Sequence, residues 1–144
     1  MRAVALGAVH SEEIEIRTGR AETVVDLTDE VTAFLRQHDG QDGLLHAWVP
    51  HATAGLVVME TGAGSDDDLL TALRDLLPAD DRWSHRHGSP GHGRDHVLPA
   101  LIAPSMSVPV IDGRPAWGTW QSLCLVDTNG DNPVRRLRLS FLPG

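Results

Sequence analysis

The spacing of apolar residues along the 144-residue chain predicts two helices set among strands. Between Asp66 and Leu77 the leucines recur at helical spacing, three aspartates open the segment, and Pro78 ends it. A shorter helix is predicted to begin with Thr28 as its cap and to end before Gly40. The rest of the apolar pattern favours extended structure.

Seven other segments are apolar and rich in β-branched residues, and we predict them to be strands. They are 3–9, 13–18, 44–49, 55–59, 106–111, 117–126 and 134–141. Asp112-Gly113 and Asn129-Gly130 are typical hairpin turns, so the last three strands are expected to follow one another through hairpins. Strands on both sides of two helices give an α+β fold with a mostly antiparallel sheet. One domain is expected over residues 1–144.

Composition narrows the classes of partner. A formal charge of -8 argues against a nucleic-acid groove or an anionic membrane surface, because both select for clustered positive charge. All twelve cationic side chains are arginine, which excludes Schiff-base lysines and Walker-type phosphate loops. No apolar run approaches the roughly 20 residues of a membrane span. The lone Cys124 lies in an apolar run, so we expect a cytoplasmic protein with a buried thiol.

The segment from Arg82 to His96 holds four of the eight histidines. Imidazole is the commonest metal ligand, and catalytic zinc sites take three protein ligands. His92 and His96 have the i, i+4 spacing of a helical pair, but Gly93 between them disfavours a helix. A solvated loop whose histidines bind nothing fits the spacing equally well. The length of the connection favours a functional or disordered segment.

Several motifs occur together in a fixed order. They are "HATAGLVVME", "WSH", "DHVLPALIAPSMSVPV", "GTWQSLCLVD" and "RRLRL", with "RTGR" and "DLTDEV" near the start. In this order and at this spacing they resemble the YjbQ-like family over nearly the whole chain. The resemblance implies a small α+β subunit that forms a homotrimer. It also implies a weak thiamine-phosphate synthase activity.

The resemblance further implies a metal site. Carried over position by position, the ligands of a divalent metal ion are His51, His85 and His96. They come from a strand end, a loop and a helix start, and three imidazoles favour zinc. His87 and His92 match no position of the family pattern, so we expect them to lie outside the site.

The same comparison suggests roles for residues around the metal. The candidate catalytic residues are Glu60, Asp68 and Gln121. The candidate substrate-binding residues are Thr53, Trp120, Arg20, Arg135 and Arg136, with the three arginines as a phosphate clamp. Trp120 would offer its ring to a flat heterocycle, and Gln121 its amide to the ligand. The alternative is a core role for Trp120 and a backbone-satisfying role for Gln121.

Two departures from the family pattern bear on activity. Arg86 stands where many relatives have an acid, and Asp95 stands where they have serine. Asp95 would either orient a neighbouring imidazole or change the charge of the site. Two functions therefore stay open: a metal-dependent enzyme acting on a phosphorylated or heterocyclic small molecule, and a non-catalytic metal- or ligand-binding trimeric module.

Overall fold

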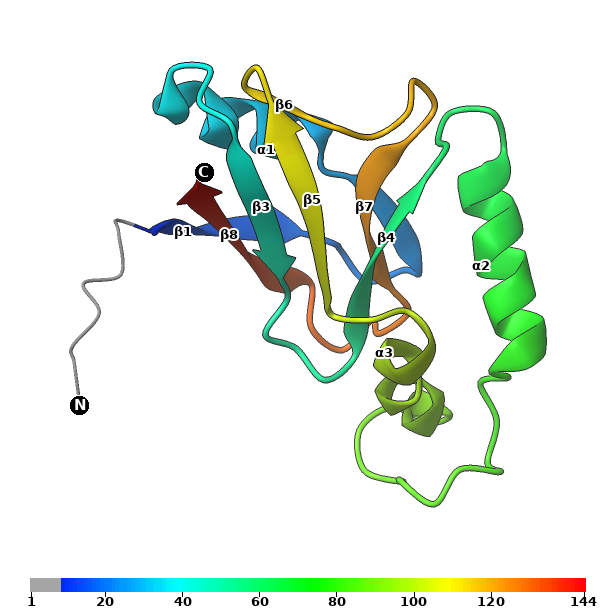
Figure 1. The fold of residues 1–144 in the computed structure, drawn as a ribbon. Coiled ribbons are helices and arrows are strands. Elements are labelled where there is room, and N and C mark those ends of the chain that lie inside the picture. Colours follow the sequence, from blue (N-terminus) through cyan, green and yellow to red (C-terminus); the bar gives the residue numbers. More distant parts are fainter. Residues whose placement is uncertain (1–8) are drawn as a thin grey trace, which may run out of the picture.

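The computed structural model describes residues 9–144 and has the expected α+β architecture, with every strand pairing antiparallel (Figure 1). The strands are β1 (His10–Arg17), β2 (Thr23–Asp26), β3 (Gly43–Trp48), β4 (Ala54–Met59), β5 (Ser105–Ile111), β6 (Arg114–Pro115), β7 (Ser122–Asp127) and β8 (Val134–Pro143). The helices are α1 (Thr28–Leu35), α2 (Ser65–Leu76) and α3 (Leu98–Leu101), with 3₁₀ turns η1 (Arg36–His38) and η2 (His92–His96). The strand predicted at 3–9 falls almost wholly outside the described residues.

The strands form two sheets that enclose the main core. One sheet has the order β1-β8-β3-β5-β6 and the other the order β2-β7-β4. Alternate residues of both sheets meet α1 in this core, so that Leu45, Leu125 and Leu139 are at most 1% exposed. Alternate side chains reach this core because successive residues of a strand point to opposite faces of the sheet.

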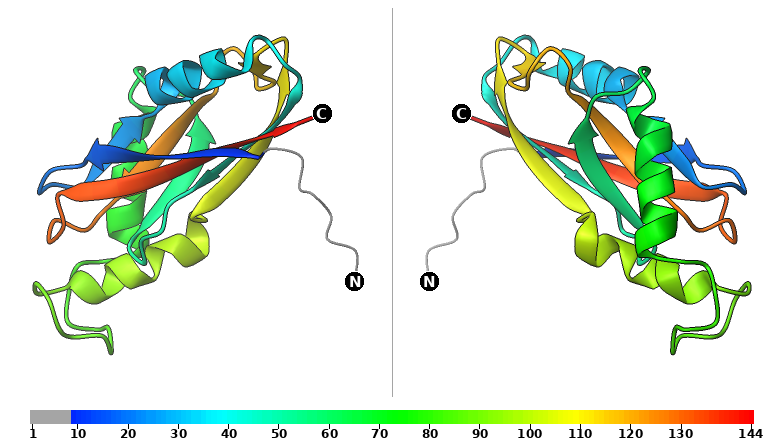
Figure 2. Two further views of the ribbon diagram at one scale, coloured as in Figure 1. Left: turned by 90° about the vertical axis from the view of Figure 1, so that its left-hand side faces the viewer. Right: turned by 90° about the vertical axis from the view of Figure 1, so that its right-hand side faces the viewer.

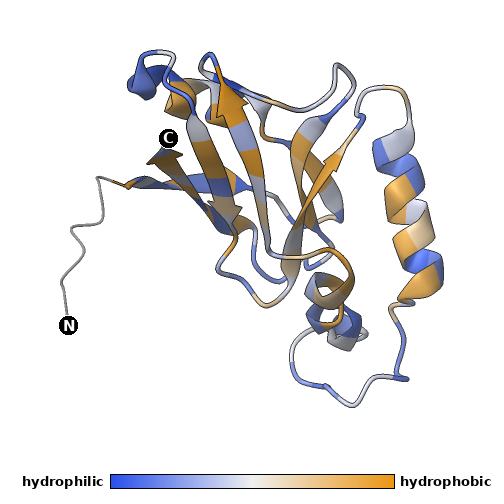
Figure 3. Ribbon diagram, viewed as in Figure 1, coloured by the Kyte–Doolittle hydropathy of each residue, from blue (hydrophilic) through white to orange (hydrophobic). Residues whose placement is uncertain are grey.

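Helices α2 and α3 cover the other face of the three-stranded sheet (Figure 2). Leu73 and Leu77 pack there against Leu98 and Val126 in a second apolar cluster. Figure 3 shows the hydrophobic residues concentrated in the strands and along α2, whereas the connection after α2 is largely hydrophilic. That connection must therefore be held by polar contacts. Within residues 9–144, no helix is long and apolar enough to cross a membrane.

Helix α1 begins where the sequence predicts, but its capping differs. The Thr28 side chain does not cap the helix; instead Asp26 accepts hydrogen bonds from the backbone N–H (2.9 Å) and the hydroxyl (2.5 Å) of Thr28. These bonds, with one from Thr61, outweigh the effect of partial burial and hold the pKa of Asp26 below its usual value. The carboxylate two residues before the helix thus satisfies an N–H that the helix leaves free.

The expected succession of hairpins near the C-terminus is wrong. Asp112 and Gly113 do form the predicted turn, with φ of 52° and 75°, but β6 after it has only two residues. Residues 117–121 form a loop rather than a strand, and β7 and β8 belong to different sheets. The chain therefore crosses between sheets at Asn129, whose side-chain oxygen accepts from the N–H of Asp131.

Candidate metal centre

Three histidines converge at the end of the molecule where α3 lies. One ligand nitrogen each from His85, His92 and His96 lies within 4.8 Å of the other two. The Nε2 atoms of His92 and His96 are 2.9 Å apart. The Nε2 of His85 is buried, and within residues 9–144 it has no hydrogen-bond partner. Three imidazoles around one point, one with an orphaned buried nitrogen, fit the donor set of a divalent transition metal such as zinc.

The turn that carries two of these histidines depends on its glycines. Gly91 starts η2 with a φ of 78°, in the left-handed region that glycine adopts without strain. A Cβ on Gly93 would lie 2.5 Å from the Cβ of Trp83 and 2.7 Å from the carbonyl oxygen of His85. Gly93 therefore lets the loop segment 83–85 lie directly against η2. That close approach brings His85 beside His92 and His96.

Buried polar side chains anchor η2 to the rest of the fold. Arg94 is 7% exposed, donates to the carbonyl of Leu77 at the end of α2 (3.3 Å), and pairs with Glu22. Although partial burial raises the pKa of Glu22, hydrogen bonds from Arg94 and Arg74 outweigh it and hold this pKa below its usual value. Trp83 donates its indole N–H to the carbonyl of Pro78 (2.8 Å). Contacts with the end of α2 and with Glu22, just before β2, thus hold the loop in place.

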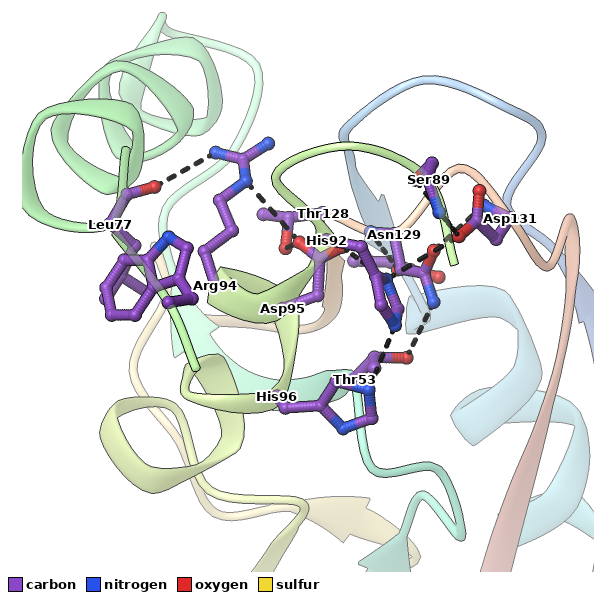
Figure 4. Close-up of polar contacts among 12 residues, drawn as sticks. Thr53, Leu77, Ser89, His92, Arg94, Asp95, His96, Thr128, Asn129 and Asp131 are labelled. Atoms are coloured by element: carbon purple, nitrogen blue, oxygen red, sulfur yellow. Dashed lines mark hydrogen bonds and ion pairs between the residues drawn. The ribbon is translucent and has the colours of Figure 1, made fainter. Parts of the chain in front are cut away.

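Asp95 connects the histidines to the sheet (Figure 4). It is 4% exposed, its Oδ1 accepts from the hydroxyl of Thr128 (2.6 Å), and its Oδ2 lies 3.2 Å from Nδ1 of His92. A carboxylate on Nδ1 places the proton there and leaves Nε2 of His92 with a free lone pair. This contact supports the orienting role among the two expected for Asp95. The imidazole that Asp95 orients is that of His92, three residues earlier in the chain.

The protonation of the other two imidazoles also suits ligation. Burial, followed by the charges of the neighbouring imidazoles, lowers the pKa of His85 below its ordinary value of 6.5. Burial and His92 lower the pKa of His96, against the opposing effect of Asp95. Both rings are therefore neutral at pH 7. Neutral imidazole is the form that binds metal.

Within one chain the structure groups His85 and His96 with His92 rather than with His51, so the expected ligand set of His51, His85 and His96 is not assembled there. Nε2 of His51 accepts a hydrogen bond from the backbone N–H of Arg136 (2.8 Å), in a separate surface hollow. His92 takes the third position, although we expected it to lie outside. Gly93 disfavours an α-helix, but it allows the 3₁₀ turn η2 and the close packing of the segment that carries His85. The ring of His87 packs at an angle against that of His85, with centroids 4.0 Å apart, and His87 is not one of the three.

The other predicted catalytic residues lie at the opposite end of the sheet (Figure 1). Glu60 follows β4, whose first residue is next to Thr53, so the strand separates it from the histidine end by about 20 Å. Asp68 is in the first turn of α2, whose last turn leads toward the histidines. Trp120 and Gln121 are exposed in the β6–β7 loop. Trp120 is 74% exposed, so it is no core residue.

The predicted arginine clamp does not form either. Arg135 is 2% exposed and binds both carboxylate oxygens of Asp127, at 2.6 and 3.2 Å, and the hydroxyl of Thr53 at 3.0 Å. The side chains of Arg135, Asp127 and Thr53 therefore form a buried hydrogen-bonded network that holds the strands together. Arg136 is exposed and pairs with Glu13, and Arg20 is exposed at the start of β2. The side-chain NH₂ of Asn129 joins this buried network by donating to the hydroxyl of Thr53 (3.2 Å).

Comparison with known proteins places the chain in a family. A family model described as UPF0047 protein YjbQ-like matches residues 12–144. UPF0047 protein Rv2556c of Mycobacterium tuberculosis is 57% identical over 134 residues, which cover 93% of this chain and 98% of that protein. UPF0047 protein YugU of Bacillus subtilis is 30% identical over 122 residues, 81% of this chain and 88% of that protein. The crystal structure of a YbjQ-like protein of unknown function from Sulfolobus solfataricus P2 superimposes with a TM-score of 0.87 at 26% identity, covering 95% of this chain and 99% of that one. The matches confirm the resemblance seen in the motifs, and the chain belongs to the UPF0047 family of YjbQ-like proteins.

Proposed function

We propose that this protein is a small-molecule enzyme whose centre is a divalent metal ion, zinc by ligand type, held by His85, His92 and His96. The observation that carries the proposal is the convergence of the three imidazoles on one point, with the buried Nε2 of His85 left without a partner in residues 9–144. A three-histidine ion supplies a Lewis acid with an open coordination position, the arrangement typical of catalytic zinc.

The residues around the trio give this site its selectivity. A cavity of about 430 Å³ adjoins His85 and is also lined by Asp80, Asp81, Trp83, Arg86 and Ser89. The guanidinium of Arg86 has no carboxylate within 4.0 Å in the described part of the chain, so it is free to bind an anion. We assign the substrate to phosphorylated small molecules on this basis. Thiamine-phosphate synthesis is the reaction to assay first, because the family resemblance implies it.

The alternative is a metal- or ligand-binding module without catalysis. This alternative is favoured because the two carboxylates nearest the trio already accept hydrogen bonds from other groups and so are not free to carry a proton. Asp95 is buried against Thr128, and Asp131 accepts from the N–H and hydroxyl of Ser89, which lower its pKa. A proton carrier would have to come from another group. Turnover of pyrimidine pyrophosphate and thiazole phosphate that disappears with a chelator would favour the enzyme; tight binding without turnover would favour the module.

A homotrimer is the assembly that the family resemblance implies, and we include it in the proposal. The outer face of the five-stranded sheet supports it, because no described helix covers that face. Leu44, Trp48, Ile111 and Leu142 are 38% to 55% exposed, and Leu44 and Leu142 are cross-strand partners. Exposed apolar patches of this kind mark protein interfaces. Sedimentation at micromolar concentration should give three chain masses, and Leu44→Arg should give monomers. A monomeric unmodified protein would contradict the assembly.

The cell compartment that fits the proposal is the cytoplasm. Burial raises the pKa of the Cys124 thiol to about 12, so it stays protonated inside the core. A single buried thiol is compatible with a reducing compartment, where disulfides are rare.

Replacing Asp95 with asparagine should weaken metal binding by about 10- to 100-fold, the usual cost of removing a group that orients a ligating imidazole. Asparagine keeps the shape of Asp95 and still accepts from Thr128, but it loses the charge that holds the Nδ1 proton of His92. Competition titration with a chromophoric chelator measures the affinity. Asp80→Asn is the matched control, because Asp80 pairs with Arg82 in the same loop and touches none of the trio. Equal losses in both variants would show a general charge effect and contradict the orienting role.

A further inference from the structure

A second cleft, of about 740 Å³, lies at the end of the molecule away from the histidines. Ser122, the first residue of β7, lines it, whereas Asp127 at the other end of the same strand belongs to the buried network with Thr53. The five residue steps of strand from Ser122 to Asp127 span about 17 Å. The cleft is thus separate from the candidate metal centre. Its volume lies within the roughly 300–1,000 Å³ of small-molecule sites.

The walls of the cleft combine an apolar floor with hydrogen-bond donors. Helix α1 contributes Val31 and Leu35, which are 1% and 2% exposed, and the facing loop contributes the half-buried Trp117. Oε1 of Gln121 accepts from the N–H of Gly118 (2.7 Å), which leaves the amide NH₂ of Gln121 to donate. A flat apolar body with an acceptor at its edge suits such a lining.

The net charge of the cleft lining is opposite in sign to that of the whole chain. Arg36 and Arg114 both line the cleft, and the segments that carry them meet where Gly113 packs against Gly40. Seven of the eleven arginines in residues 9–144 have a carboxylate within 4.0 Å. The four without one are Arg20, Arg36, Arg86 and Arg114. Two unpaired guanidiniums against the single carboxylate of Asp112 give the lining a net charge of +1, in a chain of net charge -8.

We propose that this cleft binds a small organic phosphomonoester with a flat, apolar body. Arg36 and Arg114 hold the dianion from two sides, and the body lies on Val31, Leu35 and Trp117. Arginine forks suit phosphate because they donate two parallel hydrogen bonds. The proposal goes beyond the metal centre and does not depend on it.

Phenyl phosphate is the probe, and the indole N–H resonances of the four tryptophans are the reporters. We expect titration to shift the Trp117 resonance while the imidazole resonances of His85, His92 and His96 stay in place. The double variant Arg36→Gln/Arg114→Gln should bind about tenfold or more weakly, as expected for loss of charge-assisted hydrogen bonds. Arg17→Gln/Arg20→Gln removes the same charge outside the cleft and should bind within about twofold of the unchanged protein.

Four results would overturn the proposal. The first is that Trp117 does not respond to millimolar phenyl phosphate in a folded protein. The second is equal binding by the two double variants, which would place the anion elsewhere. The third is an equal shift of Trp117 with benzyl alcohol, which would show an apolar groove without anion recognition. Shifts confined to the histidine trio would likewise count against it.

Discussion

Replacing His92 with alanine should abolish stoichiometric binding of a divalent metal ion. The side chain supplies one of three converging nitrogens, and without it the ion would keep only two of its three protein ligands. Metal content measured by mass spectrometry on protein purified without an affinity tag should fall from about one ion per chain to near zero. His96→Ala should behave in the same way.

His51→Ala is the matched control for this experiment. Its imidazole accepts a hydrogen bond from the Arg136 backbone and lies outside the trio, so the variant should keep its metal. The reverse outcome, with metal lost from His51→Ala and retained in His92→Ala, would restore the ligand set that the family motifs suggested. It would also show that the arrangement within one chain is not the binding arrangement.

Replacing Arg135 with methionine should lower the free energy of unfolding by about 3–5 kcal/mol, the usual cost of leaving one partner of a buried ion pair uncompensated. Arg135 and Asp127 are 2% and 1% exposed and share two hydrogen bonds. Urea denaturation monitored by circular dichroism gives this free energy. Arg136→Met removes the next arginine, which is exposed, and should change it by no more than about 0.5 kcal/mol.

The pair of variants also separates two roles for Arg135. If the side chain were a phosphate clamp, as its motif suggested, Arg135→Met would lose ligand binding with little loss of stability. The double variant Arg135→Met/Asp127→Asn completes the cycle, because it removes the unpaired charge and should recover part of the lost stability.

The fold was predictable from the sequence wherever a segment has one apolar face. The helical spacing of the leucines in α2 and the alternation in β1 each indicate an element with one buried face. The partner of each strand was less predictable. Val134–Pro143 alternates buried and exposed residues, whereas Ser122–Asp127 is buried on both faces, and neither pattern identifies the strand that pairs with it.

The candidate site was predictable only in part, and for a physical reason. The motifs identified His85 and His96, but the third position depends on contacts between segments. Gly93 has a low helix propensity, yet the lack of a Cβ is what admits Trp83 and His85 beside η2. The position of Asp95 three residues after His92 could have indicated a role for His92, because that spacing places a carboxylate and an imidazole on one side of a helical turn.

Anomalous diffraction at the zinc edge, from crystals of protein purified without a tag and supplied with one equivalent of zinc, tests the metal centre most directly. We expect one peak per chain, about 2.0–2.1 Å from one nitrogen each of His85, His92 and His96, with a coordination position left open. A peak at His51, or no peak at the trio at full zinc loading, would contradict the proposed centre.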